Sequence, residues 1–422
     1  MSLQGTFNTS VQALNTQAQN LSNISTNIAN VNTTGYKLQG SRFSTLLNRV
    51  SPVNQKFFSV KTTDFREVDK QGIITPTSRA FDVALNGRGF FVTNTKPGGD
   101  GGWQYTRDGS FFGKAVQLTS DSDADGQDDQ GTLLTTANGS YVFGWAADEN
   151  GNITETNNLN ALTPVMFNNN GVFPSQATSN ISLQANLSAD GGGRQTVGLP
   201  YVDQSGVSRT LTVGFTGSLT SEWGLDMTSF GPNNQQAPVT FDPPTIVFNE
   251  VGQIETPTNG QFTVTINDGS GPQTMTLDLS QMTQFADSGA FTVQNIDQDG
   301  FLAGRLQDTY FNQKGILVGS YSNGEIRNLY KLPVARFEAE NNLDTRSGNI
   351  FLQSATSGDL ELTGLGNSVG RTEMIVGALE QSNVDLADQF SKMIVTQRAY
   401  SSSATVLRTA DEMSQAAREL KR

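Results

Sequence analysis

The chain has 422 residues, no Cys, no His, 43 Gly and a formal net charge of −13. Without Cys and His it lacks disulfides, thiol nucleophiles, the commonest general base and the best zinc ligands. The acidic balance disfavours nucleic acid and anionic membranes as partners, and no stretch approaches the ~18 apolar residues of a membrane span. We therefore expect a non-enzymatic protein that has no cofactor and no membrane insertion, with length enough for about two to four domains.

Residues 1–36 contain no charged residue, and their apolar positions recur about every 3.5 residues, as Phe7, Val11, Leu14, Leu21 and Ile28. This period predicts a helix that packs on a partner helix. Six Asn residues between positions 8 and 30 lower its helix propensity. We therefore expect a segment that is disordered in the monomer and folds when it packs against other helices. The alternative is an amphipathic helix that caps its own domain.

A distinct motif follows this predicted helix. Asn27 and Asn30 fall at its end, Gly35 fits a helix stop, and Tyr36 and Lys37 begin an extended chain. The run resembles the N-terminal signature of the bacterial flagellar axial proteins, a family of rod, hook and junction subunits. Its place directly behind an uncharged heptad helix makes the match specific.

Residues 37–71 are expected to form an extended linker, and residues 72–149 the first part of an inner β-domain. The alternation of Val83 and Leu85 predicts a strand, and the Asn-Gly pair at 86–87 predicts a two-residue hairpin turn. Residues 105–112 predict a second hairpin. Both runs are similar to the β-domain of the same family.

Residues 150–296 differ in composition and are expected to form an inserted, outer, all-β domain. They contain eleven acidic residues and two Arg, a balance of −9 that accounts for most of the net charge of the chain. Alternating runs bounded by Asn-Gly and Asp-Gly turns predict strands with a solvated acidic face. No family resemblance is evident in this stretch, as expected of a domain that faces outward.

Residues 297–371 are expected to form the second part of the inner β-domain, and residues 372–422 a C-terminal helix. The heptad rhythm returns there as Leu386, Phe390, Met393, Tyr400 and Leu407. Ser382 and Asp385 predict a capping box, and Lys421 and Arg422 stand where a helix end favours cations. The motif of Gln397, Arg398, Ala399 and Tyr400 is similar to the C-terminal helix signature of the flagellar family.

One motif suggests a metal. Asp121, Asp123 and Asp125 match the first half of an EF-hand calcium loop. Thr132 stands where such a loop carries its bidentate Glu, and no flanking helices are predicted. The alternative is a solvated acidic turn. The aromatic pairs at 57–58, 90–91 and 111–112 are expected to pack within cores and sheets rather than to bind ligands.

The resemblance covers residues 1–112 and 297–422. It implies a mainly β multidomain protein, with two or three β-rich domains nested on paired N- and C-terminal helices. It also implies a structural subunit of a self-assembling helical tube, the flexible joint that transmits torque from the flagellar motor and rod to the filament. The length favours the hook type over the shorter rod type. The alternatives are a distal rod or hook–filament junction subunit, and an exported adhesin with a coiled-coil stalk.

The resemblance further implies partners and a location. The partners would be further copies of the chain, the distal rod, the hook cap, the hook–filament junction proteins and the flagellar type III export apparatus. The protein would be extracellular. The first residues show no basic segment followed by an apolar one, so we expect export without a cleavable signal peptide.

Overall fold

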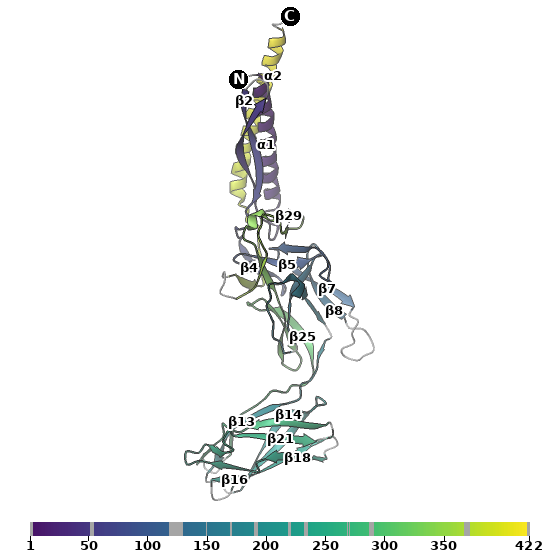
Figure 1. Cartoon of the computed structure of the whole chain (residues 1–422), viewed down its shortest axis with the longest axis vertical. Coiled ribbons are helices and arrows are strands. Elements are labelled where there is room, and N and C mark those ends of the chain that lie inside the picture. Colours follow the sequence, from purple (N-terminus) through teal and green to yellow (C-terminus); the bar gives the residue numbers. More distant parts are fainter. Residues whose placement is uncertain are drawn as a thin grey trace.

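The computed structural model describes residues 3–50, 55–117, 130–148, 150–168, 171–189, 193–217, 221–231, 235–267, 269, 271–286, 291–366 and 372–419. The molecule is elongated and has three parts, which we call the stalk, the inner body and the outer domain (Figure 1). The two ends of the chain lie at the tip of the stalk, and the outer domain lies at the opposite end. The predicted fold class, mainly β with paired terminal helices, is confirmed.

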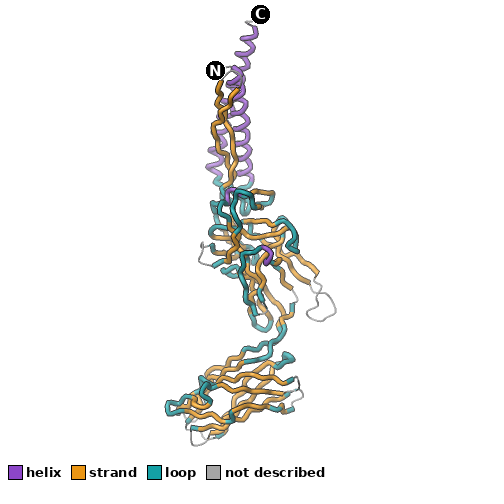
Figure 2. The backbone as a smooth tube through the Cα atoms, in the orientation of Figure 1, coloured by secondary structure: helices purple, strands orange, loops and turns teal. Residues whose placement is uncertain are grey.

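The stalk consists of α1 (Leu3–Ala29), α2 (Leu386–Glu419) and a hairpin formed by β1 (Gln39–Val50) and β2 (Gln55–Arg66). The two helices lie side by side, and the hairpin runs along α1 (Figure 2). Because α1 begins and α2 ends at the tip, the helices are antiparallel.

The hairpin corrects the prediction of an extended linker over residues 37–71. β1 and β2 pair over their whole length, from Gln39 opposite Arg66 to Val50 opposite Gln55. The sequence shows no clean alternation here because the ribbon rests on α1 through polar contacts. Asn23 Nδ2 donates to Ser41 Oγ at 2.7 Å and to Asp64 Oδ1 at 2.8 Å.

The inner body is built from two passages of the chain that interleave in one sheet. β28 of the second passage pairs with β5, β27 pairs with β9, and β30 pairs with β6. Within the described residues this sheet has fifteen strands. They are β5 (Phe90–Asn94), β6 (Trp103–Thr106), β7 (Phe111–Gln117), β8 (Gln130–Thr136), β9 (Tyr141–Ala146), β10 (Thr163–Pro164), β11 (Met166–Asn168), β12 (Val172–Phe173), β25 (Gly304–Phe311), β26 (Ile316–Tyr321), β27 (Ile326–Lys331), β28 (Pro333–Arg336), β29 (Asp344–Arg346), β30 (Ile350–Leu352) and β31 (Glu361–Gly364).

Shorter elements complete the inner body. β3 (Ile74–Pro76) pairs with β33 (Ala378–Glu380), and β4 (Val83–Asn86) pairs with β32 (Glu373–Val376). The described residues also include the single-turn 3₁₀ helices η1 (Leu159–Ala161) and η3 (Glu340–Asn342). The pairs β3–β33 and β4–β32 place the start of the first passage against the end of the second, directly beneath the stalk.

Both hairpins predicted for the first passage are wrong. β4 pairs with β32 instead of β5, and β6 pairs with β5 and β30 while β7 pairs with β8. Positive φ values of 123° at Gly87 and 116° at Gly89 redirect the chain between β4 and β5. Alternation therefore located these strands, but their partners come from residues far away in the sequence.

The aromatic pairs have mixed surroundings. Phe90, Phe91 and Phe111 are buried, as predicted, and Phe90 and Phe91 belong to two different core clusters. Phe112 is 41% exposed, with the guanidinium of Arg79 4.1 Å from the centre of its ring. The side chains of the pair at 57–58 lie outside the described residues.

Over the residues described between 180 and 298, the outer domain is a sandwich of two six-stranded sheets around one apolar core. One sheet holds β13 (Asn180–Ser188), β18 (Val239–Asp242), β21 (Gln261–Asn267), β22 (Pro272–Asp278), β23 (Thr283–Phe285) and β24 (Thr292–Gln298). The other holds β14 (Arg194–Val202), β15 (Ser208–Gly217), β16 (Glu222–Phe230), β17 (Gln236–Ala237), β19 (Thr245–Phe248) and β20 (Ile254–Thr256). Burial alternates along β16 and β21, as expected for strands with one face on a core.

The predicted start of this domain at residue 150 is too early. β10, β11 and β12 return to the sheet of the inner body, where they pair with β9, β8 and β25. The outer sheets begin at Asn180 and end at Gln298. The acidic composition that suggested the boundary marks a solvated surface, and it does not mark where the sheets change.

Candidate assembly surface and stalk junction

The interior of the stalk is largely polar. The buried residues of α1 are small or polar apart from one, and they are Gly5, Ser10, Thr16, Asn23, Ile24 and Asn27. Asn27 Nδ2 donates to Gln389 Oε1 of α2 at 3.0 Å, and Asn20 Nδ2 donates to Thr396 Oγ1 at 3.0 Å. Hydrogen bonds of this kind fix the alignment of two helices but bury little apolar surface.

The apolar side chains of the stalk lie largely outside this interior. On the described parts of α1 and α2, eight large ones have exposed fractions between 40% and 66%: Phe7, Leu386, Phe390, Ile394, Val395, Tyr400, Val406 and Met413. We call these the exposed apolar set. Exposed apolar side chains in this number make the two helices a candidate surface for interaction with another molecule.

The ten heptad residues of the two terminal segments, which we call the predicted assembly seam, differ in burial. Phe7, Leu386, Phe390 and Tyr400 belong to the exposed apolar set. The remaining seam residues are partly buried, and they are Val11, Leu14, Leu21, Ile28, Met393 and Leu407. The sequence pattern did not single out Ile394, Val395 or Val406, although the first stands four residues after Phe390, on the same side of the helix.

Where the stalk meets the inner body, a carboxylate is buried between two cations. Lys37 Nζ lies 2.7 Å from Glu380 Oε1, and Arg107 Nη1 lies 3.3 Å from Glu380 Oε2. All three side chains are at most 1% exposed. The backbone N–H of Gly72 also donates to Glu380 Oε1, at 2.9 Å. We call these three side chains the junction triad.

Burial lowers the pKa of Lys37, and the charge of Glu380 opposes that shift. Burial also lowers the pKa of Arg107, again opposed by Glu380. A second buried carboxylate, Glu340, lies 3.1 Å from Arg88 Nε. A buried charge is costly when it loses its partner, so Glu380 is needed to hold both cations.

The N-terminal motif surrounds this triad. Tyr36 Oη donates to Asn27 Oδ1 at 3.0 Å, and Asn27 Nδ2 donates to the carbonyl of Gln39 at 2.7 Å. Gly35 has φ 67°, its N–H donates to the carbonyl of Glu380 at 2.8 Å, and a Cβ there would lie 2.8 Å from the backbone N of Asp108. Only glycine fits this close approach without strain.

The other motif residues lie apart from the triad. Asn30 makes local contacts at the end of α1, where Nδ2 donates to the carbonyl of Thr26 and Oδ1 accepts from Thr33. The C-terminal motif is in the middle of α2, with Gln397, Arg398 and Tyr400 exposed and Ala399 partly buried.

The predicted capping box of Ser382 and Asp385 is wrong. Asp385 itself caps α2, because Oδ1 accepts from the N–H groups of Ala387 at 2.8 Å and Asp388 at 3.2 Å. Ser382 Oγ accepts from Val384 N, before the helix begins. Lys421 and Arg422 lie outside the described residues.

Sequence reasoning missed Asn383, which ties α2 to the linking chain. Its Oδ1 accepts from Leu38 N at 2.7 Å, and its Nδ2 donates to the carbonyls of Glu67 and Lys70 at 3.0 and 3.1 Å. The burial and pairing of Glu380 and Arg107 were not predicted, since a charged residue in a sequence usually lies on the surface.

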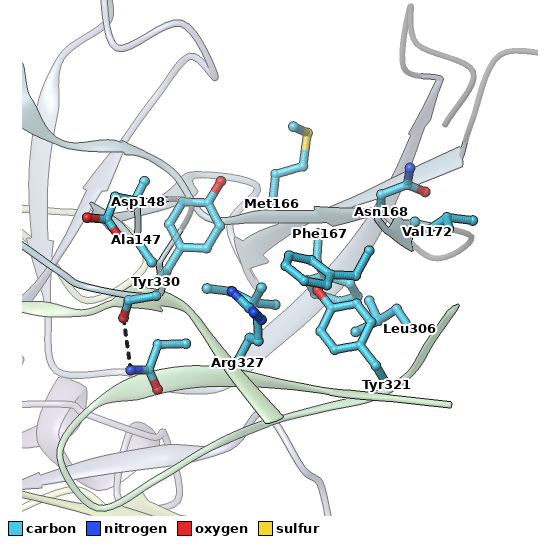
Figure 3. Close-up of a pocket in the computed structure, with 16 residues that line it drawn as sticks. Ala147, Asp148, Met166, Phe167, Asn168, Val172, Leu306, Tyr321, Arg327 and Tyr330 are labelled. Atoms are coloured by element: carbon cyan, nitrogen blue, oxygen red, sulfur yellow. Dashed lines mark hydrogen bonds between the residues drawn. The ribbon is translucent and has the colours of Figure 1, made fainter. Parts of the chain in front are cut away.

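A cavity of about 300 Å³ lies in the inner body, and its lining includes Met166, Tyr321, Arg327 and Tyr330 (Figure 3). Arg327 stands over the rings of Phe173 and Phe301, with Cζ 3.9 and 4.8 Å from their centres. Phe173 also lies 5.5 Å from the ring of Tyr321. The two connections to the outer domain pair with each other, since Gln176 N donates to the carbonyl of Phe301 at 2.9 Å. These contacts brace the connection between the two bodies.

The calcium-loop candidates Asp121, Asp123 and Asp125 lie outside the described residues. Within the part of the chain that the structure describes, no group of three or more acidic side chains could hold a metal ion. In the same part, neither α1 nor α2 is apolar enough over its length to cross a membrane.

Three family models match the chain. Residues 7–37 match the "Flagella basal body rod protein" model, residues 194–301 match the "Flagellar basal body protein FlaE D2 domain" model, and residues 375–420 match the "Flagellar basal body rod FlgEFG protein C-terminal" model. The second match lies in the outer domain, where the sequence had shown no family resemblance, so that expectation is corrected.

Relatives that align with most or all of the chain are named "Flagellar hook protein FlgE". The chain is 30% identical over 434 residues to "Flagellar hook protein FlgE" of Rhizobium meliloti (strain 1021), and 32% identical over 432 residues to that of Brucella suis biovar 1 (strain 1330). Both alignments cover 100% of this chain and 100% of the relative. The protein of that name from Salmonella typhimurium is 28% identical, with 83% of this chain and 84% of the relative covered. Among solved structures, the Helicobacter pylori flagellar hook protein FlgE2 matches 73% of this chain and 100% of its own, at a TM-score of 0.49 and 12% identity.

Proposed function

The chain belongs to the flagellar hook protein family and is a structural subunit of the flagellar hook; from that premise we propose that it polymerises through the exposed apolar set of its stalk. The observation that carries this proposal is that the stalk buries polar side chains and exposes apolar ones. Its interior holds amide and hydroxyl contacts, whereas Phe390 and Val395 are 51% and 66% exposed. Covering such side chains releases about 25 cal/mol per Å² of apolar area.

The uncharged helix α1 suits the inside of a tube. A helix without charges can be covered on several sides without desolvating an ion. Identical subunits joined head to tail without closure form an open helical polymer, which is the form that a hook requires. In this proposal the partly buried seam residues Leu14, Leu21, Ile28, Met393 and Leu407 complete the helix packing between subunits.

The junction triad gives the subunit its mechanical role. Torque applied to the stalk must reach the inner body through residues 30–72 and 376–386, which meet at Lys37, Glu380 and Asn383. Buried ion pairs with several hydrogen bonds hold a defined geometry there. The outer domain, joined by two braced connections, supplies an outer shell whose small contacts can change as the tube bends.

Membership of the hook protein family also supports a set of partner proteins at the two ends of the tube. We assign the distal rod, the hook cap and the hook–filament junction proteins as end contacts, and the flagellar type III apparatus as the export route to an extracellular hook. In this proposal the outer unit is residues 180–298, the span of the outer sheets, instead of the residues 150–296 predicted from the sequence.

The test compares two Phe→Asp variants of similar exposure. Phe390→Asp places a charge in the proposed interface, and Phe112→Asp places one on the inner body, where Phe112 is 41% exposed. Electron microscopy of the full-length protein under polymerising conditions should show tubes for the wild type and Phe112→Asp but none for Phe390→Asp. Both variants should keep the melting temperature of the wild-type monomer.

The outcome that contradicts the proposal is a Phe390→Asp variant that forms normal tubes. A discrete oligomer in place of tubes, for the wild type, would instead point to the coiled-coil stalk of an adhesin. Deletion of the gene in cells should leave a rod without a hook, which separates a hook subunit from a distal rod or junction subunit.

A further inference from the structure

A groove of about 420 Å³ opens on the side of the stalk, between α1, the β1–β2 hairpin and α2. Its apolar walls come from Ile24, Leu38, Phe43, Phe65 and Val395. Phe43 and Val395 are 48% and 66% exposed, so the mouth of the groove is apolar as well. Polymer packing through the exposed apolar set does not by itself say what fills this groove.

The groove is held open by the packing around it. A Cβ on Gly40 would lie 2.6 Å from the ring of Phe65, so the missing side chain at this position leaves room for that ring. The guanidinium of Arg42 covers the ring at 4.4 Å from its centre. On the helical side, Asn20 of α1 donates a hydrogen bond to Thr396 of α2, with 3.0 Å between Nδ2 and Oγ1. This bond fixes the spacing of the two helices. These contacts form a preorganised receptacle.

The charged residues at the groove already have partners. Lys392 Nζ lies 2.7 Å from Asp388 Oδ2, and Glu67 Oε2 lies 2.8 Å from Lys70 Nζ. A charged occupant would therefore find no free counter-charge among these side chains and would lose its hydration. The occupant that fits is an uncharged, apolar segment.

We propose that Phe7, on α1 of a second copy of the chain, inserts into this groove. Residues 1–36 are uncharged, whereas α2 carries Asp388, Lys392, Arg398 and further charges along its length. Phe7 is the one large apolar side chain in the described part of α1 that is more than a third exposed, at 43%. The groove is continuous with the exposed apolar set, because Val395 belongs to both.

The spacing along the stalk makes the contact intermolecular. Phe7 stands thirteen residues before Asn20, so it lies about 20 Å from the groove of its own chain. A second copy displaced by about that distance along the stalk brings its own Phe7 to the groove of the first. The two surfaces differ, so the contact is head to tail and repeats without closing. The inference rests on the proposed polymerisation and names one contact within it.

The absence of Cys from the chain allows a direct test by disulfide formation. In full-length protein carrying both Phe7→Cys and Val395→Cys, assembly followed by mild oxidation should give a ladder of covalent multimers on denaturing gels. A disulfide requires Cα atoms within about 7 Å, which excludes closure within one chain over the spacing above. On the same denaturing gels, each single variant should run as a monomer after assembly and oxidation. A mixture of the two single variants should give covalent dimers and no larger species.

Failure of this contact can be told apart from failure of polymerisation. Tubes that form without a ladder would overturn the Phe7 contact and leave the proposed function intact. If the double variant does not assemble, the second measurement is the protein concentration needed for tubes. Phe7→Ser should raise it about tenfold or more, equivalent to about 1.4 kcal/mol. Ile326→Ser, at 62% exposure in the inner body, should leave it unchanged. An unchanged threshold for Phe7→Ser would also overturn the contact.

Discussion

The stalk and the outer domain distribute their apolar residues in opposite ways. In the outer domain, side chains such as Phe215, Trp223 and Phe262 are at most 2% exposed within a single core between two sheets. In the stalk, Phe390 and Val395 are 51% and 66% exposed, and hydrogen bonds among Asn, Gln and Thr side chains join the two helices. One region therefore completes its own hydrophobic core, and the other leaves apolar side chains exposed in the single chain.

This difference separates the regions that stabilise the monomer from those that stabilise the polymer. The outer domain has the burial expected of a unit that folds alone. The stalk helices gain little from apolar burial within one chain, and α1 carries many residues of low helix propensity. We infer that the outer domain contributes to monomer stability and that the stalk contributes to polymer stability.

The largest expected effect breaks the core of the outer domain. Phe215→Ala removes a fully buried ring and should lower the free energy of unfolding of this domain by about 3–5 kcal/mol. Phe390→Ala, in the stalk, should leave thermal unfolding of the monomer unchanged, because its ring is half exposed. Calorimetry of both monomeric variants checks this. An equal loss in both would mean that the stalk belongs to the folded core of the monomer.

A second prediction concerns the joint between the stalk and the inner body. Glu380→Ala leaves Lys37 and Arg107 buried without a counter-charge and should destabilise the inner body by about 3 kcal/mol. The matched control is Asp226→Ala, which removes an exposed ion pair with Arg194 in the outer domain and should have no measurable effect. Chemical denaturation measures both. A silent Glu380→Ala variant would show that the triad does not support the junction.

The sequence predicted the helical parts of this fold better than the sheets, for a physical reason. A heptad repeat is a local pattern, so residues 7–28 and 386–407 revealed helices that need partners. β4 pairs with β32, nearly 300 residues away, and such pairing leaves no local trace. The β1–β2 hairpin escaped prediction because it rests on polar contacts, which produce no alternation of apolar residues.

The candidate site was predicted in part. Gly35, Tyr36 and Lys37 were singled out by their motif, and the structure brings them together with Asn27 at the junction. Their counterpart Glu380 could not be found, because its burial depends on chain segments separated by more than 270 residues. The heptad pattern found apolar stripes but could not say whether they meet within one chain. In the structure several of them face outward.

A third prediction compares how fast a protease cuts the stalk and the outer domain. Limited proteolysis of the monomer should cut the stalk first and then stall, leaving roughly residues 67–385 intact. The reason is that residues held by few apolar contacts open locally at low free energy. In assembled tubes the stalk should become resistant. Mass spectrometry of the fragments checks this, and early cuts within the sheets of the outer domain would reverse the assignment of the stable and unstable regions.

The smallest expected effect is a dependence on alkaline pH that is confined to the inner body. Burial in β6 raises the pKa of Tyr105 from 10 to about 12. Between these values the unfolded chain releases a proton that the folded chain keeps, so the free energy of unfolding falls as pH rises. The stability linked to Tyr105 is fully present below pH 10 and is lost towards pH 12, by about 1.4 kcal/mol at pH 11. Tyr105→Phe should therefore show a shallower loss of stability than the wild type from pH 10 to 12, and similar slopes for the two would contradict the prediction. The outer domain should unfold identically in both proteins, because Tyr105 lies in the core of the inner body and in none of the sheets of the outer domain.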